Sequence, residues 1–151
     1  MESDPDLEVP PYRMFLPTKR YFEFKVESCE PGARVGLYGS SEEEYDYVVF
    51  LGGDSNNEIL IMDSNGEIFA RASYFGVLQC HKSSPYWVAW EPGVIEVGKG
   101  QYPHTILLEG RDEKLTLVTS MALLTWERGL PVEHPTKWTI KRRTGQCYLC
   151  D

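Results

Sequence analysis

Apolar and polar residues alternate along much of this chain with the two-residue period of a half-buried β-strand. Residues 21–26 are the clearest case, because three apolar side chains share one face and three side chains with polar ends share the other. The apolar face holds Phe22, Phe24 and Val26, and the other face holds Tyr21, Glu23 and Lys25. This pattern predicts a strand at the surface of a core.

Two segments of the chain are typical of β-hairpins. Residues 84–91 form an aromatic alternating run, Glu91-Pro92-Gly93 follows as a tight turn, and residues 94–100 alternate again. Asp63-Ser64-Asn65-Gly66 separates two further runs, and its Asn-Gly pair readily supplies two positive-φ positions. Each segment therefore predicts two antiparallel neighbours in a sheet.

The remaining alternating runs bring the prediction to about nine or ten short strands, the number and spacing typical of an all-β sandwich or barrel. We expect an antiparallel two-sheet β-sandwich of the jelly-roll or lectin-like kind, with little or no helix, because helical periodicity is absent. Residues 120–126 suit a helical turn as well as a strand. The other predicted strands are residues 33–38, 45–51, 58–62, 67–71, 104–108, 114–119 and 137–141.

The chain is expected to hold one domain. Residues 1–19 are rich in proline and form an extended N-terminal arm that is free to dock on a sheet edge. Residues 20–141 form the β-sandwich domain, and residues 142–151 form a C-terminal tail with a Cys-x-x-Cys motif. A length of 151 residues with 42% hydrophobic residues suffices for a core without metal or disulfide support.

Charge and hydropathy restrict the partners. The formal net charge of −8 opposes binding to nucleic acid or to an anionic membrane surface. No apolar run is long enough for membrane insertion, and the acidic start is unlike a signal peptide. The localisation stays open between the cytoplasm and a domain excised from a secreted protein, since a recombinant domain also begins with Met.

The four cysteines, Cys29, Cys80, Cys147 and Cys150, are all disulfide candidates. They allow two disulfides in any of three pairings or four free thiols, and the sequence leaves both redox states open. Cys147 and Cys150 could form a zinc site with the other pair. A disulfide in the tail, or free thiols, is favoured over zinc because Cys29 and Cys80 are solitary and far apart.

No motif predicts catalysis, a cofactor or a metal. Residues 36–44 have only two glycines and lead into a strand, so they do not resemble a nucleotide-binding turn. Residues 63–66 lack the outer ligands of a calcium loop. The three histidines, His81, His104 and His134, lie in separate segments without zinc or triad spacing.

The hairpin at residues 84–100 resembles the signature of the farnesoic acid O-methyltransferase domain family. The resemblance rests on Tyr86-Trp87-Val88-Ala89-Trp90, on residues 93–100 and on the order of the flanking strands, and it covers about residues 20–141. It departs at Asp54 and at residues 121–126, where the family usually has Trp or Gly-Trp-Gly. The family name implies methyl transfer from S-adenosylmethionine, but this chain has neither the glycine-rich turn nor the acidic residue that a methyltransferase of the common type needs.

The sequence therefore favours a non-catalytic binding module for a glycan or a protein surface. Aromatic side chains with polar ends suit such surfaces, and loops on a rigid sandwich usually carry binding. The predicted ligand-binding residues are Tyr38, Tyr45, Asp54, Asn56, Asn57 and Tyr102. The alternatives are an S-adenosylmethionine-dependent farnesoic acid O-methyltransferase, which the resemblance implies, and a structural domain that forms homo-oligomers through its sheet edges.

Overall fold

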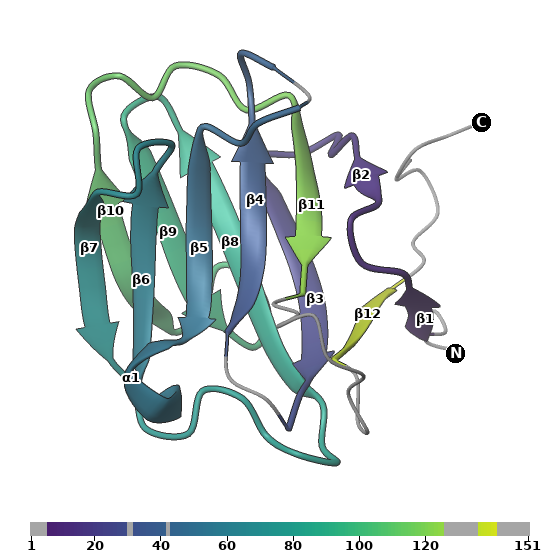
Figure 1. Ribbon diagram of the computed structural model, residues 1–151. Coiled ribbons are helices and arrows are strands. Elements are labelled where there is room, and N and C mark those ends of the chain that lie inside the picture. The colour runs from purple at the N-terminus through teal and green to yellow at the C-terminus, as the bar shows by residue number, and fades with distance from the viewer. Residues whose placement is uncertain (1–5, 30–31, 42, 126–135, 142–151) are drawn as a thin grey trace.

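The protein is a sandwich of two antiparallel β-sheets (Figure 1). The structure is a computed structural model that describes residues 6–29, 32–41, 43–125 and 136–141. The strands are β1 (Asp6–Val9), β2 (Met14–Phe15), β3 (Tyr21–Glu27), β4 (Ala33–Tyr38), β5 (Tyr47–Gly52), β6 (Glu58–Asp63), β7 (Ile68–Ser73), β8 (Ser84–Glu91), β9 (Val94–Lys99), β10 (Ile106–Arg111), β11 (Ser120–Leu124) and β12 (Lys137–Lys141). One short helix, α1 (Gly53–Asn56), follows β5, and no helix in the described ranges could span a membrane.

Each sheet has six strands. One has the order β1-β12-β3-β8-β9-β10 and is called the β3–β8 sheet below; the other has the order β2-β11-β4-β5-β6-β7 and is called the β4–β7 sheet. The predicted two-sheet antiparallel sandwich is confirmed. The predicted number of strands was too low, because it left out β1 and β2 and left the segment that forms β11 open between a helical turn and a strand.

The core lies between the sheets and is built from the alternating faces that the sequence displays. In β3, Phe22, Phe24 and Val26 are buried and the residues between them are partly exposed. Phe24 packs against the fully buried Trp138 of β12, with ring centroids 5.6 Å apart. Since side chains alternate across a strand, burial of these residues turns Tyr21, Glu23 and Lys25 to the outer face of the β3–β8 sheet.

Both predicted hairpins form. In the β8–β9 hairpin, Tyr86 pairs with Lys99 and Glu91 pairs with Val94, around a turn in which Gly93 has a φ of 83°. In the β6–β7 hairpin only Gly66 has a positive φ, whereas two such positions were expected. The Asp63 carboxylate accepts the backbone N–H groups of Asn65 and Glu67, which stabilises a turn with a single left-handed residue.

The prediction for residues 104–119 was wrong in detail. The strand β10 reaches Arg111, into the expected turn, and residues 114–119 are not a strand. They pass over the β8–β9 turn, where the Gly93 N–H donates to the Leu115 carbonyl. Leu115 is 4% exposed and Leu117 is 62% exposed. The alternating pattern here therefore reflects the burial of Leu115 alone and not the pairing of a strand. Residues 120–126, which suited a helical turn as well as a strand, contain the strand β11.

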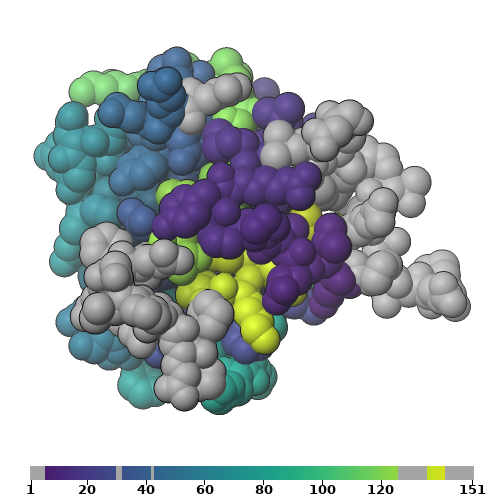
Figure 2. All heavy atoms as spheres, turned by 45° about the vertical axis from the view of Figure 1, so that its right-hand side comes forward, coloured from purple at the N-terminus to yellow at the C-terminus, as the bar shows by residue number. Residues whose placement is uncertain are grey.

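The N-terminal arm docks on the edges of both sheets. Strand β1 pairs with β12, and β2 pairs with β11. Figure 2 shows the purple N-terminal segment against the yellow β12 on this side of the molecule. The division into an arm, a sandwich domain and a tail stays a prediction, and residues 142–151, with Cys147 and Cys150, lie outside the described residues.

Candidate functional site

The predicted ligand-binding residues lie in three separate places. Tyr38 and Tyr45 meet edge to face, with ring centroids 6.3 Å apart. Tyr38 is only 7% exposed and packs with Ala122 and Leu124 in a small cluster separate from the main core. Burial raises the pKa of the Tyr38 phenol, so this hydroxyl stays protonated at neutral pH. Tyr38 therefore has a packing role, and a ligand-binding role for Tyr38 and Tyr45 stays a prediction.

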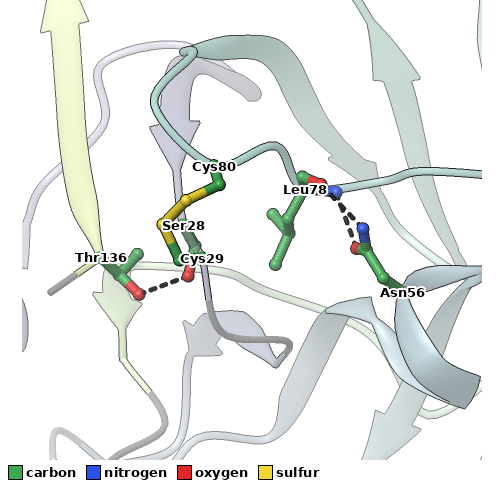
Figure 3. The surroundings of a disulfide bond; sticks show 6 residues. All are labelled: Ser28, Cys29, Asn56, Leu78, Cys80 and Thr136. Carbon is green, nitrogen blue, oxygen red and sulfur yellow. Dashed lines mark hydrogen bonds between the residues drawn. A yellow bond between two sulfur atoms is a disulfide. The ribbon is translucent and has the colours of Figure 1, made fainter. Parts of the chain in front are cut away.

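The second group, Asp54, Asn56 and Asn57, lies in and after α1. The Asn56 side chain donates to the Leu78 carbonyl at 2.7 Å and accepts from the Leu78 N–H at 2.8 Å (Figure 3). The Asn56 carbonyl also accepts the N–H groups of Gly76 and Val77. Both ends of the Asn56 amide are therefore occupied in holding the loop before β8.

Tyr102 lies over the outer face of the β3–β8 sheet. Its ring stacks on Tyr21 of β3 with centroids 4.0 Å apart and planes 8° apart. The ring also meets Trp87 of β8 edge to face, with centroids 5.1 Å apart. Three aromatic side chains from different segments thus form one cluster, in which Tyr102 is 36% exposed and Trp87 is fully buried.

The loop that carries Tyr102 is fixed to this face by hydrogen bonds. The Trp87 indole Nε1–H donates to the His104 carbonyl at 2.8 Å, and the Tyr102 N–H donates to Glu23 Oε2 at 3.2 Å. Gly98 leaves room for the Trp87 ring, because a Cβ at this position would lie 2.0 Å from a ring carbon. The exposed Tyr102 ring is therefore held in a defined position.

A hollow of about 170 Å³ adjoins the aromatic cluster and is called the β3 hollow below. Glu23 lines it and also accepts the Tyr102 N–H, so the hollow and the cluster share a residue. An ion pair of 2.8 Å between Lys25 Nζ and Asp6 Oδ2 lies at its edge. The Thr139 hydroxyl is buried and has no hydrogen-bond partner among the described residues. The polar residues of the lining are Asp6, Glu23, Lys25, Gln101, Thr139 and Lys141.

A second hollow, of about 390 Å³, lies where the β4–β5, β6–β7 and β10–β11 connections meet. Its carboxylates belong to Asp46, Asp63 and Asp112, and each one accepts hydrogen bonds from groups of the protein. Asp112 accepts from the Lys114 N–H and the Tyr47 hydroxyl, and these two bonds lower the pKa of its carboxyl. The aromatic residue of this acidic hollow, Tyr47, is buried, so the hollow has no exposed aromatic ring in its lining.

The model of the farnesoic acid O-methyl transferase family matches residues 10–134, which is most of the chain. The chain belongs to this family. The match confirms the resemblance carried by the β8–β9 hairpin and extends it into the N-terminal arm. The comparison with curated proteins gave no match.

Solved structures with similar folds cover nearly the whole chain. The carbohydrate-binding module CBM66 from Bacillus subtilis superposes with a TM-score of 0.55 at 9% identity, covering 93% of this chain and 81% of the module. A tetrameric galectin from the ball sponge Cinachyrella sp. gives 0.56 at 13% identity, covering 91% of this chain and 99% of the galectin. At such identities these likenesses show the lectin-like fold alone.

The candidate site consists of the Tyr102 cluster and the β3 hollow. Of its residues, the sequence analysis named only Tyr102 as a ligand-binding candidate. It missed Glu23, Lys25, Gln101 and Thr139. The signal for two of them was present, since the outward face of the strand at residues 21–26 carries Glu23 and Lys25. The sequence does not show that β12 lies beside β3, and this pairing places Thr139 opposite Lys25.

Proposed function

We propose that this protein is a non-catalytic module that binds a glycan on the outer face of the β3–β8 sheet, at Tyr102 and the β3 hollow. The observation that carries the proposal is the exposed Tyr102 ring, fixed by Tyr21 and Trp87 beside a hollow whose mainly apolar lining also holds charged and amide side chains. An aromatic face covers the C–H patches of a sugar ring, and polar groups beside it bind the hydroxyls.

The balance of polar groups supports a ligand rich in hydroxyls. Asp6 and Glu23 are acceptors, Lys25 and Lys141 are donors, and the Gln101 amide supplies both functions. Opposite charges are present in equal number, so the hollow does not select a strongly anionic or cationic ligand by charge. Sugar hydroxyls both donate and accept, and they match such a mixture.

The rigidity of the site also supports binding. Glu23 and Lys25 stand on β3, and the Tyr102 loop is fixed by backbone and indole hydrogen bonds. A binding surface that is already ordered loses little conformational entropy when the ligand arrives. Two of the structures with a similar fold are a carbohydrate-binding module and a galectin, which supports this class of ligand.

A glycan array tests the proposal. The wild-type protein is expected to bind a limited set of glycans, and Tyr102→Ala is expected to weaken their affinity about tenfold or more, which corresponds to ~1.4 kcal/mol. Phe75→Ala is the matched control, because Phe75 is 90% exposed and lies in the loop between β7 and β8. The proposal is wrong if no glycan binds, or if Phe75→Ala weakens binding as much as Tyr102→Ala does.

The same protein tests the alternatives. Calorimetric titration with S-adenosylmethionine addresses methyl transfer, the activity in the family name. Saturable binding of this compound without glycan binding would favour the enzyme.

Light scattering addresses a structural role, for which self-association without any ligand is the expected result. A protein surface as the ligand would leave the array blank while Tyr102→Ala still weakened capture of that partner.

A further inference from the structure

One group of three side chains outside the proposed glycan site has the composition of a metal site. Cys29, just after β3, forms a disulfide with Cys80 in the β7–β8 connection, and their Cα atoms are 4.2 Å apart. His81 follows Cys80. The two sulfur atoms and an imidazole nitrogen all lie within 4.8 Å of one another, and no other group of this kind occurs within residues 6–29, 32–41, 43–125 and 136–141.

The two cysteines are held together by more than their covalent bond. The Ser28 N–H donates to the Gln79 carbonyl at 3.1 Å, so the residues before each cysteine are joined through the backbone. The Ser28 and Thr136 hydroxyls are 2.9 Å apart, and Asn56 holds Leu78 by two hydrogen bonds (Figure 3). These contacts do not involve sulfur, and we expect them to keep the thiols close after the disulfide opens.

The position of His81 is also defined by the backbone. His81 has a φ of 64°, a left-handed conformation that is uncommon for residues other than glycine. In this conformation its imidazole lies beside both sulfur atoms. Cys80 and His81 are exposed, so an ion can reach the group from solvent.

We infer that reduction of the Cys29–Cys80 disulfide creates a binding site for Zn²⁺, with two thiolates and the His81 imidazole as ligands. A dithiol reductant supplies two electrons, the S–S bond breaks, and the reductant is oxidised to its own disulfide. Each cysteine sulfur becomes a thiol, and metal binding then releases the thiol proton to solvent. Sulfur and imidazole nitrogen are the ligands that zinc prefers, and a water molecule completes the tetrahedral set.

The geometry suits the metal in the reduced state alone. Disulfide sulfurs are not thiolates, so the oxidised protein offers only the imidazole. With Zn–S bonds of about 2.3 Å and Zn–N bonds of about 2.0 Å, the ligand atoms of a tetrahedral site lie roughly 3.5–4 Å apart. The three ligand atoms lie within 4.8 Å of one another in the oxidised protein. After the S–S bond breaks, side-chain rotation can move the two sulfurs apart to the separation that zinc needs.

The test is a Zn²⁺ titration in competition with a chromophoric chelator, with Co²⁺ as a spectroscopic probe. All proteins carry Cys147→Ser and Cys150→Ser, so that only Cys29 and Cys80 supply thiols. The reduced protein is expected to bind one equivalent at least about a hundredfold more tightly than the oxidised protein, since metal binding needs thiolate. Co²⁺ is expected to give sulfur-to-metal charge-transfer absorption in the reduced protein alone.

The variant His81→Asn tests the third ligand, because asparagine tolerates the left-handed backbone and lacks the imidazole. It is expected to weaken Zn²⁺ binding by at least about tenfold, the lower end of the loss seen even for residues that only support a ligand. His104→Gln, which removes an exposed imidazole elsewhere, is the control and is expected to bind as the parent does. Equal affinity of the reduced and oxidised proteins would overturn the inference. So would an unchanged Co²⁺ spectrum in His81→Asn, or loss of the β circular dichroism on reduction that Zn²⁺ does not restore.

Discussion

At the scale of single residues, the proposed site depends on a glycine, Gly98, that is not part of the lining of the β3 hollow. Gly98 of β9 leaves the space in which the Trp87 ring lies, and this ring supports Tyr102 from below. The absence of a side chain at Gly98 therefore positions an exposed aromatic ring two segments away. The role is steric, since the backbone of Gly98 has no unusual φ.

We expect Gly98→Ala to lower the free energy of unfolding by about 2–3 kcal/mol, because overpacking displaces a buried ring. The displaced Trp87 also loses its hydrogen bond to His104, so glycan affinity should fall together with stability. Urea unfolding measures the first effect and the glycan array the second. Gly53→Ala is the control, since a Cβ there meets nothing closer than 3.5 Å. Equal stability of the two variants would contradict the packing argument.

A second residue-scale prediction concerns pH. Burial and the hydrogen bond to Asp112 raise the pKa of Tyr47 above its ordinary 10.0, and hydrogen bonds lower the pKa of Asp112 below 3.8. A lowered carboxyl pKa adds stability that is lost as pH falls through the folded-state value, and a raised phenol pKa adds stability that is lost as pH rises above 10. Tyr47→Phe should therefore cost about 1 kcal/mol between these limits. Urea unfolding from pH 2 to 11 should show the difference shrinking at both ends; a constant difference would refute the assignment.

At the scale of elements, the α1 segment acts as a brace between the end of β5 and the loop before β8. Asn56 makes two hydrogen bonds to Leu78, and the conformation of α1 is left-handed at Asp54, Ser55 and Asn56. The sequence showed these residues as a polar loop, which is also the appearance of a ligand-binding loop. The binding role stays a prediction, and the hydrogen bonds give Asn56 a structural role.

We expect Asn56→Ala to lower the free energy of unfolding by about 2–4 kcal/mol, because it leaves two backbone groups of Leu78 unpaired and places alanine at a φ of 73°. Asn57→Ala, next in the chain, should change stability by less than about 0.5 kcal/mol, since the Asn57 φ of −121° suits any residue. Chemical denaturation compares the two variants. Similar losses of stability for both variants would contradict the structural role of Asn56.

The elements also show how far sequence reasoning reaches. Strands with one buried face, such as β3, could be predicted because burial imposes a period of two on their side chains. The exposed β1 and the two-residue β2 show no such alternation in their sequences. They are strands because β1 pairs with β12 and β2 pairs with β11. Residues 114–119 alternate without a partner strand. The site was only partly predictable for the same reason, because Thr139 and Lys25 meet through a strand pairing.

At the scale of the whole molecule, the Cys29–Cys80 disulfide links positions 51 residues apart and joins the end of β3 to the loop before β8. In the chain-entropy model, closing a loop of this length stabilises the fold by roughly 4 kcal/mol. Cys29→Ala/Cys80→Ala should therefore lower the unfolding free energy by about that amount while leaving the sandwich folded, as judged by urea denaturation and circular dichroism. A change below about 1 kcal/mol would mean that the surrounding hydrogen bonds alone determine the geometry.

The proposed glycan site lies on the outer face of the β3–β8 sheet. The most direct measurement is amide chemical-shift mapping by NMR with a glycan selected on the array. We expect the amides of Glu23, Lys25, Gln101 and Tyr102 to shift on titration, while those lining the acidic hollow at Asp46, Asp63 and Asp112 do not. Shifts confined to the acidic hollow or to the β4–β7 sheet would contradict the proposed site.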